Sequence, residues 1–277
     1  MASLQWLDRP VLRDPVALMA FEGWGDAGES ASQAVTSLIE HSEAELIAVI
    51  DPDDHFDFQV RRPMVELDSE GIRSITWPRN EIHVVRGAER DVVVVLGEEP
   101  HYRWKVFTAD LVEALNSLGV SRTITIGAFI GQVAHTLPVP LVGSSSRPDT
   151  LTLHGLLPSG YEGPTGILGV LNHALSNAGI DVTSVWAAVP HYLSNQEYPP
   201  ATEALAVKAA ELLGVTLDMG DLALETRHFL STVEEALEGN EELQKYVERL
   251  EEEADVDTEH SEHLMEEIEN FLRDQPR

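Results

Sequence analysis

Four consecutive valines, at residues 92–95, constrain the fold of this chain more than any other feature of its sequence. A continuous run of β-branched residues has no polar face, so it predicts a strand that is buried on both sides. Further strands and helices are expected along the body of the chain, and they alternate. The strands are expected at 16–21, 46–50, 123–126 and 182–189, and the helices at 27–41, 102–118, 167–178 and 200–213.

This alternation indicates the class of fold. Strands that alternate with helices favour a mostly parallel sheet that is covered by helices on both faces. Shorter alternating segments at 64–67, 72–77 and 81–85 are typical of hairpin or edge strands. The body is about 215 residues long, an ordinary size for one domain. We therefore expect a single α/β domain.

The net charge limits the partners of the chain. Asp and Glu total 48 against 18 Lys and Arg, which gives a formal charge of −30. A field of this sign repels phosphate backbones and anionic lipids, so neither nucleic acid nor a membrane is an expected partner. The sequence has no run of 18 apolar residues, and its lack of cysteine excludes disulfides, cysteine zinc sites and thiol catalysis. Residues 1–13 lack the apolar stretch of a secretory signal, so a cytoplasmic location is predicted.

The acidic residues are unevenly distributed along the chain. Residues 221–277 contain 19 acids and 5 bases, a net charge of −14. We therefore predict an α/β core domain at 1–220 and an acidic, amphipathic helical tail at 221–277. Apolar stripes at helical spacing in the tail are typical of helices that pack on the body or on each other. One stripe contains Leu264, Ile268 and Phe271, and it is a candidate interaction face through which the chain forms a homo-oligomer.

A glycine-rich turn follows the first predicted strand. Residues 23–28 have the G-x-G-x-x-G spacing of a dinucleotide-binding loop, and Asp51 ends the next strand where an acid that binds ribose belongs. Asp26 and Glu29, however, oppose a phosphate at this position. The same two acids fit a capping box at the start of the helix. We therefore expect a structural turn and no cofactor, with a nucleotide-binding regulator as an alternative.

Acids and histidines gather at the predicted strand ends, where open α/β sheets form their ligand crevice. Such side chains can hold a divalent metal, but caps, turns and loops favour the same residue types, so no metal is predicted. Arg61, Arg62 and Arg103 are the expected partners of the acids. The strand-end residues are Asp26, Asp51, Asp53, Asp54, His55, Glu98, Glu99, His101 and His191.

A second turn of small residues, at 161–166, precedes the helix expected at 167–178. It can be an anion-binding loop, but a helix-entry turn capped by Thr165 is the stronger interpretation. His191, at the end of a strand, is a candidate general acid or base by its residue type alone. The chain lacks the G-x-S-x-G, Walker A and H-E-x-x-H motifs, so the motifs alone indicate no reaction.

Six segments within residues 15–215 carry a resemblance when they are taken in order: GWGDAGES, LIAVIDPDDHFDFQVRRP, GEEPHYRWK, AHTLPVPLVGSSS, YEGPTGILGVLNHAL and VWAAVPHYL. They resemble the proteasome assembly chaperone family in its bacterial branch. The resemblance implies a three-layer α/β/α sandwich, similar to purine nucleoside phosphorylase and peptidyl-tRNA hydrolase-like proteins, without an established catalytic role.

The resemblance also bears on partners. It implies proteasome subunits as the partners of eukaryotic and archaeal relatives, which act as assembly or activating factors. Members that dock on the proteasome end in a hydrophobic-Tyr-any residue tail. This sequence ends Asp274-Gln275-Pro276-Arg277, so the resemblance does not extend to that docking tail.

These observations together predict a non-catalytic interaction factor, similar to an assembly chaperone, whose partner is itself or another protein. The alternative is an enzyme, a hydrolase or transferase acting on a nucleoside, peptide or amide in a pocket at the strand carboxyl ends. Its catalytic residues are unknown. The candidate pocket residues are Gly23, Trp24, Asp26, Asp51, Asp54, Arg62, Glu98, Glu99, Thr165 and His191.

Overall fold

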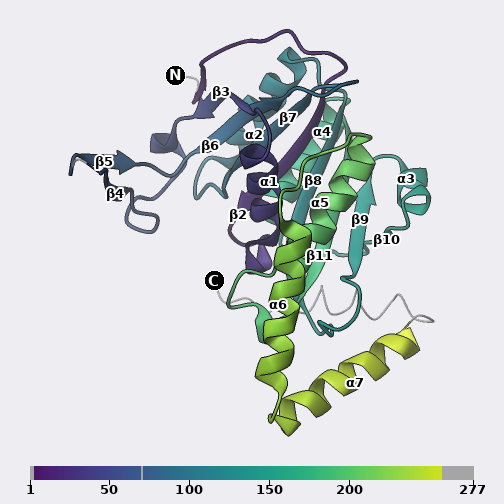
Figure 1. Ribbon diagram of the computed structural model, residues 1–277. Helices are drawn as coiled ribbons and strands as arrows, with labels where there is room; N and C mark the ends of the chain where they lie inside the picture. The colour runs from purple at the N-terminus through teal and green to yellow at the C-terminus, as the bar shows by residue number, and fades with distance from the viewer. Residues whose placement is uncertain (1–2, 70, 258–277) are drawn as a thin grey trace.

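A nine-stranded sheet forms the centre of the computed structural model, which describes residues 3–69 and 71–257. Its strands are β1 (Leu4–Trp6), β2 (Val16–Glu22), β3 (Glu45–Ile50), β6 (Asn80–Val85), β7 (Val92–Glu98), β8 (Arg122–Gly131), β9 (Leu141–Ser145), β10 (Leu157–Pro158) and β11 (Asp181–Pro190). They lie in the order β1-β3-β6-β7-β2-β8-β11-β9-β10 (Figure 1).

The centre of this sheet is parallel. β7, β2, β8 and β11 lie side by side and run in the same direction, so their carboxyl ends meet at one edge. β6 and β9 pair with this block in the antiparallel direction on its two sides. Beyond β6 the sheet continues with β3 and β1, again antiparallel. The predicted α/β sheet with a parallel centre is confirmed, and antiparallel strands extend its flanks.

Helices cover both faces of the sheet (Figure 1). One face carries α1 (Ser30–Glu40) and α5 (Pro199–Leu213), and the other carries α2 (Trp104–Ser117) and α4 (Ile167–Asn177). The chain therefore forms the three-layer α/β/α sandwich that the resemblance implies.

The valine run shows how the sheet is buried on both sides. Along β7, Val92 and Val94 face the layer of α1 and α5, whereas Val93 and Val95 face the layer of α2 and α4. All four side chains are buried. Because successive side chains of a strand point to opposite faces, a strand between two helical layers needs apolar residues at every position. The prediction of a doubly buried strand is confirmed.

The segment between β8 and α4 contains more regular structure than its many Pro, Gly and Ser residues suggest. It holds β9, the short helix α3 (Pro148–Leu153) and β10. β9 runs antiparallel to β11, with Gly143 opposite Val185. A Cβ on Gly143 would lie 2.9 Å from the carbonyl oxygen of Ser184. Glycine therefore lets this strand approach its neighbour closely.

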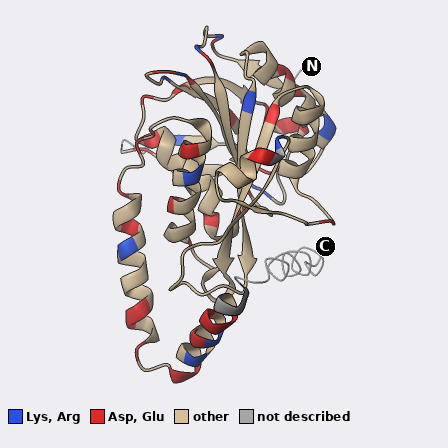
Figure 2. Cartoon of the chain, turned by 90° about the vertical axis from the view of Figure 1, so that its right-hand side faces the viewer, with Lys and Arg blue, Asp and Glu red and all other residues tan. Residues whose placement is uncertain are grey.

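The acidic segment after the body forms two helices within the described residues. α6 (Leu222–Leu237) packs on α5, and the rings of Tyr198 and Phe229 meet edge to face at 5.6 Å. α7 (Glu241–Asp257) then turns back below the sheet, and Leu250 packs against Ala134 (Figure 1). Acidic residues recur along both helices (Figure 2).

Two predictions about the tail stay predictions. Nothing in the structure tests the domain boundary placed near residue 220. Leu264, Ile268 and Phe271, the proposed interaction stripe, lie outside the described residues.

A separate two-stranded sheet projects from the body (Figure 1). Its strands β4 (Met64–Leu67) and β5 (Arg73–Thr76) pair antiparallel, with Val65 opposite Ile75. The predicted hairpin is therefore confirmed. We call residues 58–79 the arm. β6, which follows the arm, enters the large sheet instead.

Candidate functional site

The carboxyl edge of the parallel strands is where α/β folds bind their ligands. At this edge the glycine-rich turn leaves β2 and passes over β8, where Asp26 forms a bridge with Ala128. Gly23 has φ 123° and Gly28 has φ 60°, values that L side chains rarely adopt. The backbone conformation of the turn therefore requires glycine at these two positions, whether or not a ligand binds there.

Asp26 occupies the N-terminus of α1. Its Oδ1 accepts the amide hydrogens of Ala31 at 2.7 Å and Ser32 at 3.2 Å, and its Oδ2 accepts the hydroxyl of Ser32. A phosphate at this helix end would need the same amide groups. Burial raises the pKa of Asp26, although the hydrogen bonds that it accepts oppose the rise. The protein's own carboxylate therefore takes the place of an anion, which supports the prediction of a structural turn.

The predicted capping box is wrong in its detail. Glu29, and not Asp26, stands at the N-cap of α1, with φ 51° and without a side-chain cap hydrogen bond. Asp26 reaches the helix from three residues further back because a 3-10 turn, Ala27–Glu29, separates it from α1.

Glu99 plays the same part at the start of α4. Its Oε1 accepts the amide hydrogen of Ile167 at 2.7 Å, and its carboxylate also accepts the amide hydrogen of Trp24. Burial raises the pKa of Glu99, and these two hydrogen bonds oppose the rise. The predicted cap, Thr165, is exposed and donates its hydroxyl to the carbonyl oxygen of Gly166 at 3.4 Å. The helix is capped by a carboxylate from the end of β7 and not by Thr165.

Tryptophan side chains fill the space between these two caps. A Cβ on Gly127 would lie 2.7 Å from the ring of Trp186, and a Cβ on Gly166 would lie 3.1 Å from the ring of Trp24. The volume that remains is about 10 Å³, room for one water molecule at most. The residues around it are Phe21, Trp24, Gly25, Glu99, Gly166, Ile167, Leu168 and Trp186.

Two carboxylates and an arginine lie at the ends of the neighbouring strands. Glu22 and Glu98 are paired in register on β2 and β7. Arg61 donates to Glu98 through Nε, and its Nη2 lies 3.9 Å from Glu22 Oε2. Burial and, after it, the charge of Glu98 raise the pKa of Glu22. Arg61 counteracts the repulsion between the two acids and ties the arm to the sheet.

Other predicted pocket residues make surface contacts. Arg103 pairs with Asp54 at 2.5 Å. Asp51 accepts the amide hydrogen of Asp53 at 3.0 Å and so caps a turn. Arg62 is exposed, and its side chain forms no ion pair within residues 3–69 and 71–257. Of the three arginines named from the sequence, Arg61 and Arg103 are the ones that pair with the acids.

His191 belongs to an aromatic cluster beneath the tail. Its ring meets the rings of Tyr192 and Tyr246 edge to face, with centroids 5.4 Å apart in both pairs. The hydroxyl of Tyr192 accepts the amide hydrogen of His135 at 3.0 Å, and burial lowers the pKa of the His135 side chain. Because Tyr246 is on α7, this cluster attaches the tail helix to the end of the sheet.

The predicted pocket residues are spread along the whole edge of the sheet. Asp51 follows β3 and His191 follows β11, and five strand spacings separate these strands in the sheet order. At about 4.8 Å per spacing the two strand ends are about 24 Å apart, too far to share one small-molecule site. The residues that do meet at the centre of the edge are Gly23, Trp24, Asp26, Glu98 and Glu99.

Sequence analysis missed the residue that contributes most to closing this edge. Trp186 lies within β11 and was not among the predicted pocket residues, but it pairs across the sheet with Gly127 of β8. A glycine inside an otherwise apolar strand marks a close approach of another group. Gly127 therefore gave a sequence-based reason to expect a bulky side chain beside it on the neighbouring strand.

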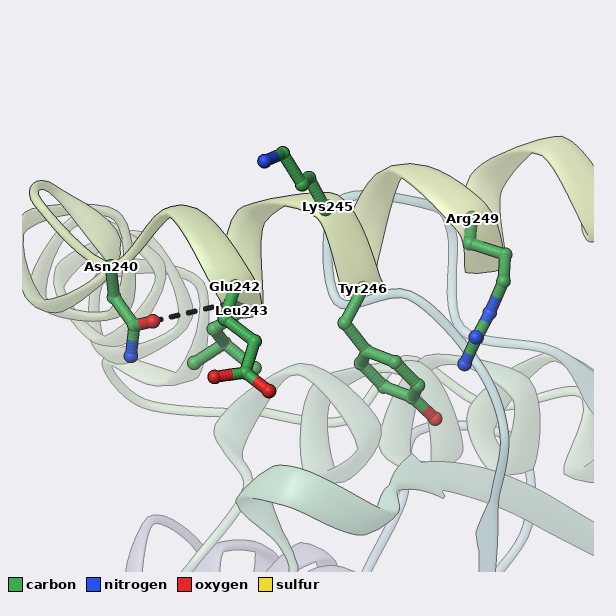
Figure 3. A pocket seen from close by; sticks show the side chains of 6 residues that line it. All are labelled: Asn240, Glu242, Leu243, Lys245, Tyr246 and Arg249. Atoms are coloured by element: carbon green, nitrogen blue, oxygen red, sulfur yellow. Dashed lines mark hydrogen bonds between the residues drawn. The ribbon is translucent and has the colours of Figure 1, made fainter.

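A wider hollow lies along α7 (Figure 3). It has a volume of about 470 Å³, and Tyr246 and Arg249 are among its residues, all of which come from α7 and the turn before it. Ligand sites enclose most of a small molecule, which a hollow built on one helix does not. The part of the chain that the structure describes contains no group of three His, Asp or Glu that could hold a metal ion.

Among residues 3–69 and 71–257, none of the helices combines the length and the apolar character that a transmembrane segment needs.

The family model of the PAC2 family matches residues 20–237 of this chain. The chain belongs to the PAC2 family. The match covers most of the sequence and ends at the last residue of α6, so it includes the α/β body and the first tail helix of this PAC2 protein. The resemblance inferred from the sequence segments is confirmed.

Solved structures agree with this assignment. A PAC2 family protein from Streptomyces avermitilis is 41% identical, over 84% of this chain and 100% of that chain, with a TM-score of 0.77. A proteasome-assembly chaperone homologue from Mycobacterium tuberculosis is 36% identical, over 84% of this chain and 99% of that chain, with a TM-score of 0.77. A protein of unknown function from the same organism shares the fold over 100% of this chain and 97% of that chain, at 24% identity and a TM-score of 0.89. A search of the curated proteins found no match.

Proposed function

We propose that this PAC2 protein is a non-catalytic, assembly-chaperone-like factor that binds another protein and associates with copies of itself. One observation carries the proposal: side chains of the protein fill the space between the glycine-rich turn and the start of α4, at the centre of the carboxyl edge, and leave a volume of about 10 Å³. An enzyme acting on a nucleoside, peptide or amide needs a pocket of roughly 300 Å³ or more.

The N-termini of α1 and α4, two of the helices that begin at this edge, support the same proposal. Asp26 accepts hydrogen bonds from the first turn of α1, and Glu99 accepts one from the first turn of α4. A nucleotide would need these amide groups for its phosphates, and it would meet two carboxylates in their place. A nucleotide-binding regulator is therefore the weakest of the three functions.

Family membership points to the kind of partner. The relative from Mycobacterium tuberculosis, at 36% identity, is a proteasome-assembly chaperone homologue. Proteasome subunits are therefore the first partners to test, in the cytoplasm, where we propose that the protein acts. The tail stripe of Leu264, Ile268 and Phe271 remains our proposal for one contact face with a second copy.

Sedimentation velocity tests the partner directly. The fluorescently labelled protein is mixed at micromolar concentrations with unassembled proteasome subunits, and in parallel with the assembled particle, from the organism that encodes it. We expect the labelled protein to sediment faster with the unassembled subunits. If it sediments unchanged with both preparations, proteasome subunits are not its partners.

An enzyme remains the second candidate because of one observation. Glu22 and Glu98 end neighbouring strands, share Arg61, and differ in exposure, since the side chain of Glu22 is 51% exposed and that of Glu98 17%. Paired carboxylates in unlike environments can act as acid and base. Hydrolysis of a nucleoside, peptide or amide that is lost in Glu22→Gln, and retained in the surface control Glu242→Gln, would overturn the non-catalytic assignment.

A further inference from the structure

The arm carries an apolar face that the described part of the chain (residues 3–69 and 71–257) leaves uncovered. Val65 and Leu67 of β4 and Ile75 of β5 lie on one face, because alternate residues of a strand point the same way and Val65 pairs with Ile75. Arg73, which pairs with Leu67, lies on the same face. Their exposed fractions are 57%, 63% and 57%. An isolated two-stranded ribbon is at best marginally stable in water, so this face needs a cover.

The root of the arm is anchored to the body. Phe58 and Trp77 meet edge to face at 4.9 Å, and Arg61 bonds to Glu98 at the carboxyl edge of the sheet. A groove of about 340 Å³ lies between this root and the β1–β3 side of the sheet, and Val49 and Ile75 are among its residues. The arm is thus held at one end, with apolar surface that continues from its strands into a groove.

The charge of the arm differs from that of the rest of the chain. Residues 58–79 contain four arginines and three acids, a net charge of +1, whereas the other residues together carry −31. Arg62 and Arg73 are exposed, and neither forms an ion pair within the residues that the structure describes. Two copies of a protein with a charge of −30 repel one another, and a segment with a net charge of +1 adds little to that repulsion.

We infer that the arm is the surface on which a second copy of this chain docks, the apolar face of one arm packing on the apolar face of the other about a twofold axis. A twofold interface brings the same patch of both copies together, which suits a patch that is apolar and carries little charge. The inference rests on the self-association in the proposed function and adds the arm to the tail stripe as a contact surface.

Sedimentation equilibrium of the full chain at tens of micromolar provides the first test. We expect a dimer for the wild type, with a dissociation constant that decreases as salt is raised, because the Debye length falls from about 10 Å at 0.1 M to about 3 Å at 1 M and screens the repulsion. The double variant Leu67→Ser/Ile75→Ser should raise the dissociation constant at least about 30-fold, as loss of central interface residues does.

Matched controls come from equally exposed apolar side chains outside the arm. Leu153 and Val207 are 79% and 55% exposed, and the double variant Leu153→Ser/Val207→Ser should dimerise as the wild type does. Circular dichroism and thermal melting show whether each variant is folded. A monomeric wild type at both low and high salt contradicts the inference, and so does a dimer that the arm variant leaves unchanged.

Cross-linking provides a second test, and it leaves the apolar residues of β4 in place. The chain contains no cysteine, so Ile75→Cys provides a single thiol on the arm and Val207→Cys a matched thiol on α5. With a short bis-maleimide, Ile75→Cys should give a covalent dimer and Val207→Cys should remain a monomer. Cross-linking through Val207→Cys alone would place the interface elsewhere and overturn the inference.

Binding to proteasome subunits, measured with the same arm variant, separates this inference from the proposed function. An arm variant that is monomeric and still binds the subunits supports both. An arm variant that remains dimeric but loses the subunits shows that the arm docks a different protein, which contradicts the inference and leaves the proposed function intact.

Discussion

Glu99 and Ile167 are 68 residues apart in the sequence, and the carboxylate of Glu99 accepts the amide hydrogen of Ile167 at 2.7 Å. This hydrogen bond joins the end of β7 to the start of α4 across the edge where a ligand would enter. Together with the bonds from Asp26 to α1, it gives the N-termini of α1 and α4 an acceptor from the protein itself.

The pH dependence of stability should show the burial of Glu99. Burial raises its pKa in the folded protein, whereas in the unfolded chain it stays near the ordinary value of about 4.3. Between these two values the folded state binds a proton that the unfolded state lacks, so the free energy of unfolding decreases as pH rises through that interval. Glu99→Gln keeps an acceptor oxygen for Ile167 and removes the titration.

Urea unfolding from pH 4 to pH 7 measures this effect. We expect the wild type to lose stability relative to Glu99→Gln as pH increases, with the difference constant once Glu99 is fully ionised. Glu242→Gln, at an exposed position of α7, should follow the wild type. A wild type that gains stability relative to Glu99→Gln across this range would show that the carboxylate is favoured by its site.

Asp26 should contribute to stability through its hydrogen bonds to α1. Asp26→Ala removes the acceptor for the amide groups of Ala31 and Ser32, and a lost cap of this kind costs about 1–2 kcal/mol. Asp26→Asn retains one acceptor oxygen and should lose less. Thermal and urea unfolding of both variants provide the measurement, and an Ala variant as stable as the wild type would refute the capping role.

The contact between Gly127 and Trp186 should be intolerant of a methyl group. Gly127→Ala places a Cβ 2.7 Å from the indole ring, and such overpacking costs about 1–3 kcal/mol. Gly131→Ala is a matched control in the same strand, because its Cβ would meet no atom closer than 3.5 Å. In the double variant with Trp186→Leu the loss should be smaller than the sum of the single losses, because the two residues contact each other. Additive losses in urea unfolding would show that the ring does not close on the strand.

The α/β body should fold without the acidic tail. A chain that ends at residue 218 should be soluble and unfold cooperatively, but it loses Phe229, which contacts Tyr198. Burial of one such side chain contributes about 1.5–3 kcal/mol, so its melting temperature should be lower than that of a chain ending at residue 238. Insoluble or non-cooperative material would show that α6 completes the core.

Much of the fold was predictable because local patterns determine it. The four valines of β7 and the helically spaced apolar residues of α2 and α4 are buried in the core. Their spacing in the sequence indicates this burial directly. The arm was also predictable as a hairpin from its alternating residues. β9 was not, because its place in the sheet depends on Gly143 meeting β11 closely, a contact between segments that no local pattern records.

The site was predictable only in part, for a related reason. Sequence analysis selected Asp26 and Glu99 correctly as strand-end acids. Asp26, however, binds an amide group five residues further along the chain, and Glu99 binds one 68 residues away. Helix capping is read from the residues just before a helix, and that rule named Asp26 with Glu29 for α1 and Thr165 for α4. The actual acceptor for α4 comes from another strand, so only the tertiary structure shows it.

Isothermal titration calorimetry of the wild-type protein with NAD, ATP and inorganic phosphate tests the closed edge most directly. If Asp26, Glu99 and the two tryptophans fill the site as structural groups, none of these ligands should bind with a dissociation constant below about 1 mM. Binding of any of them at micromolar concentrations, lost when Asp26 or Trp24 is replaced, would show that the edge opens for a ligand and would contradict the account.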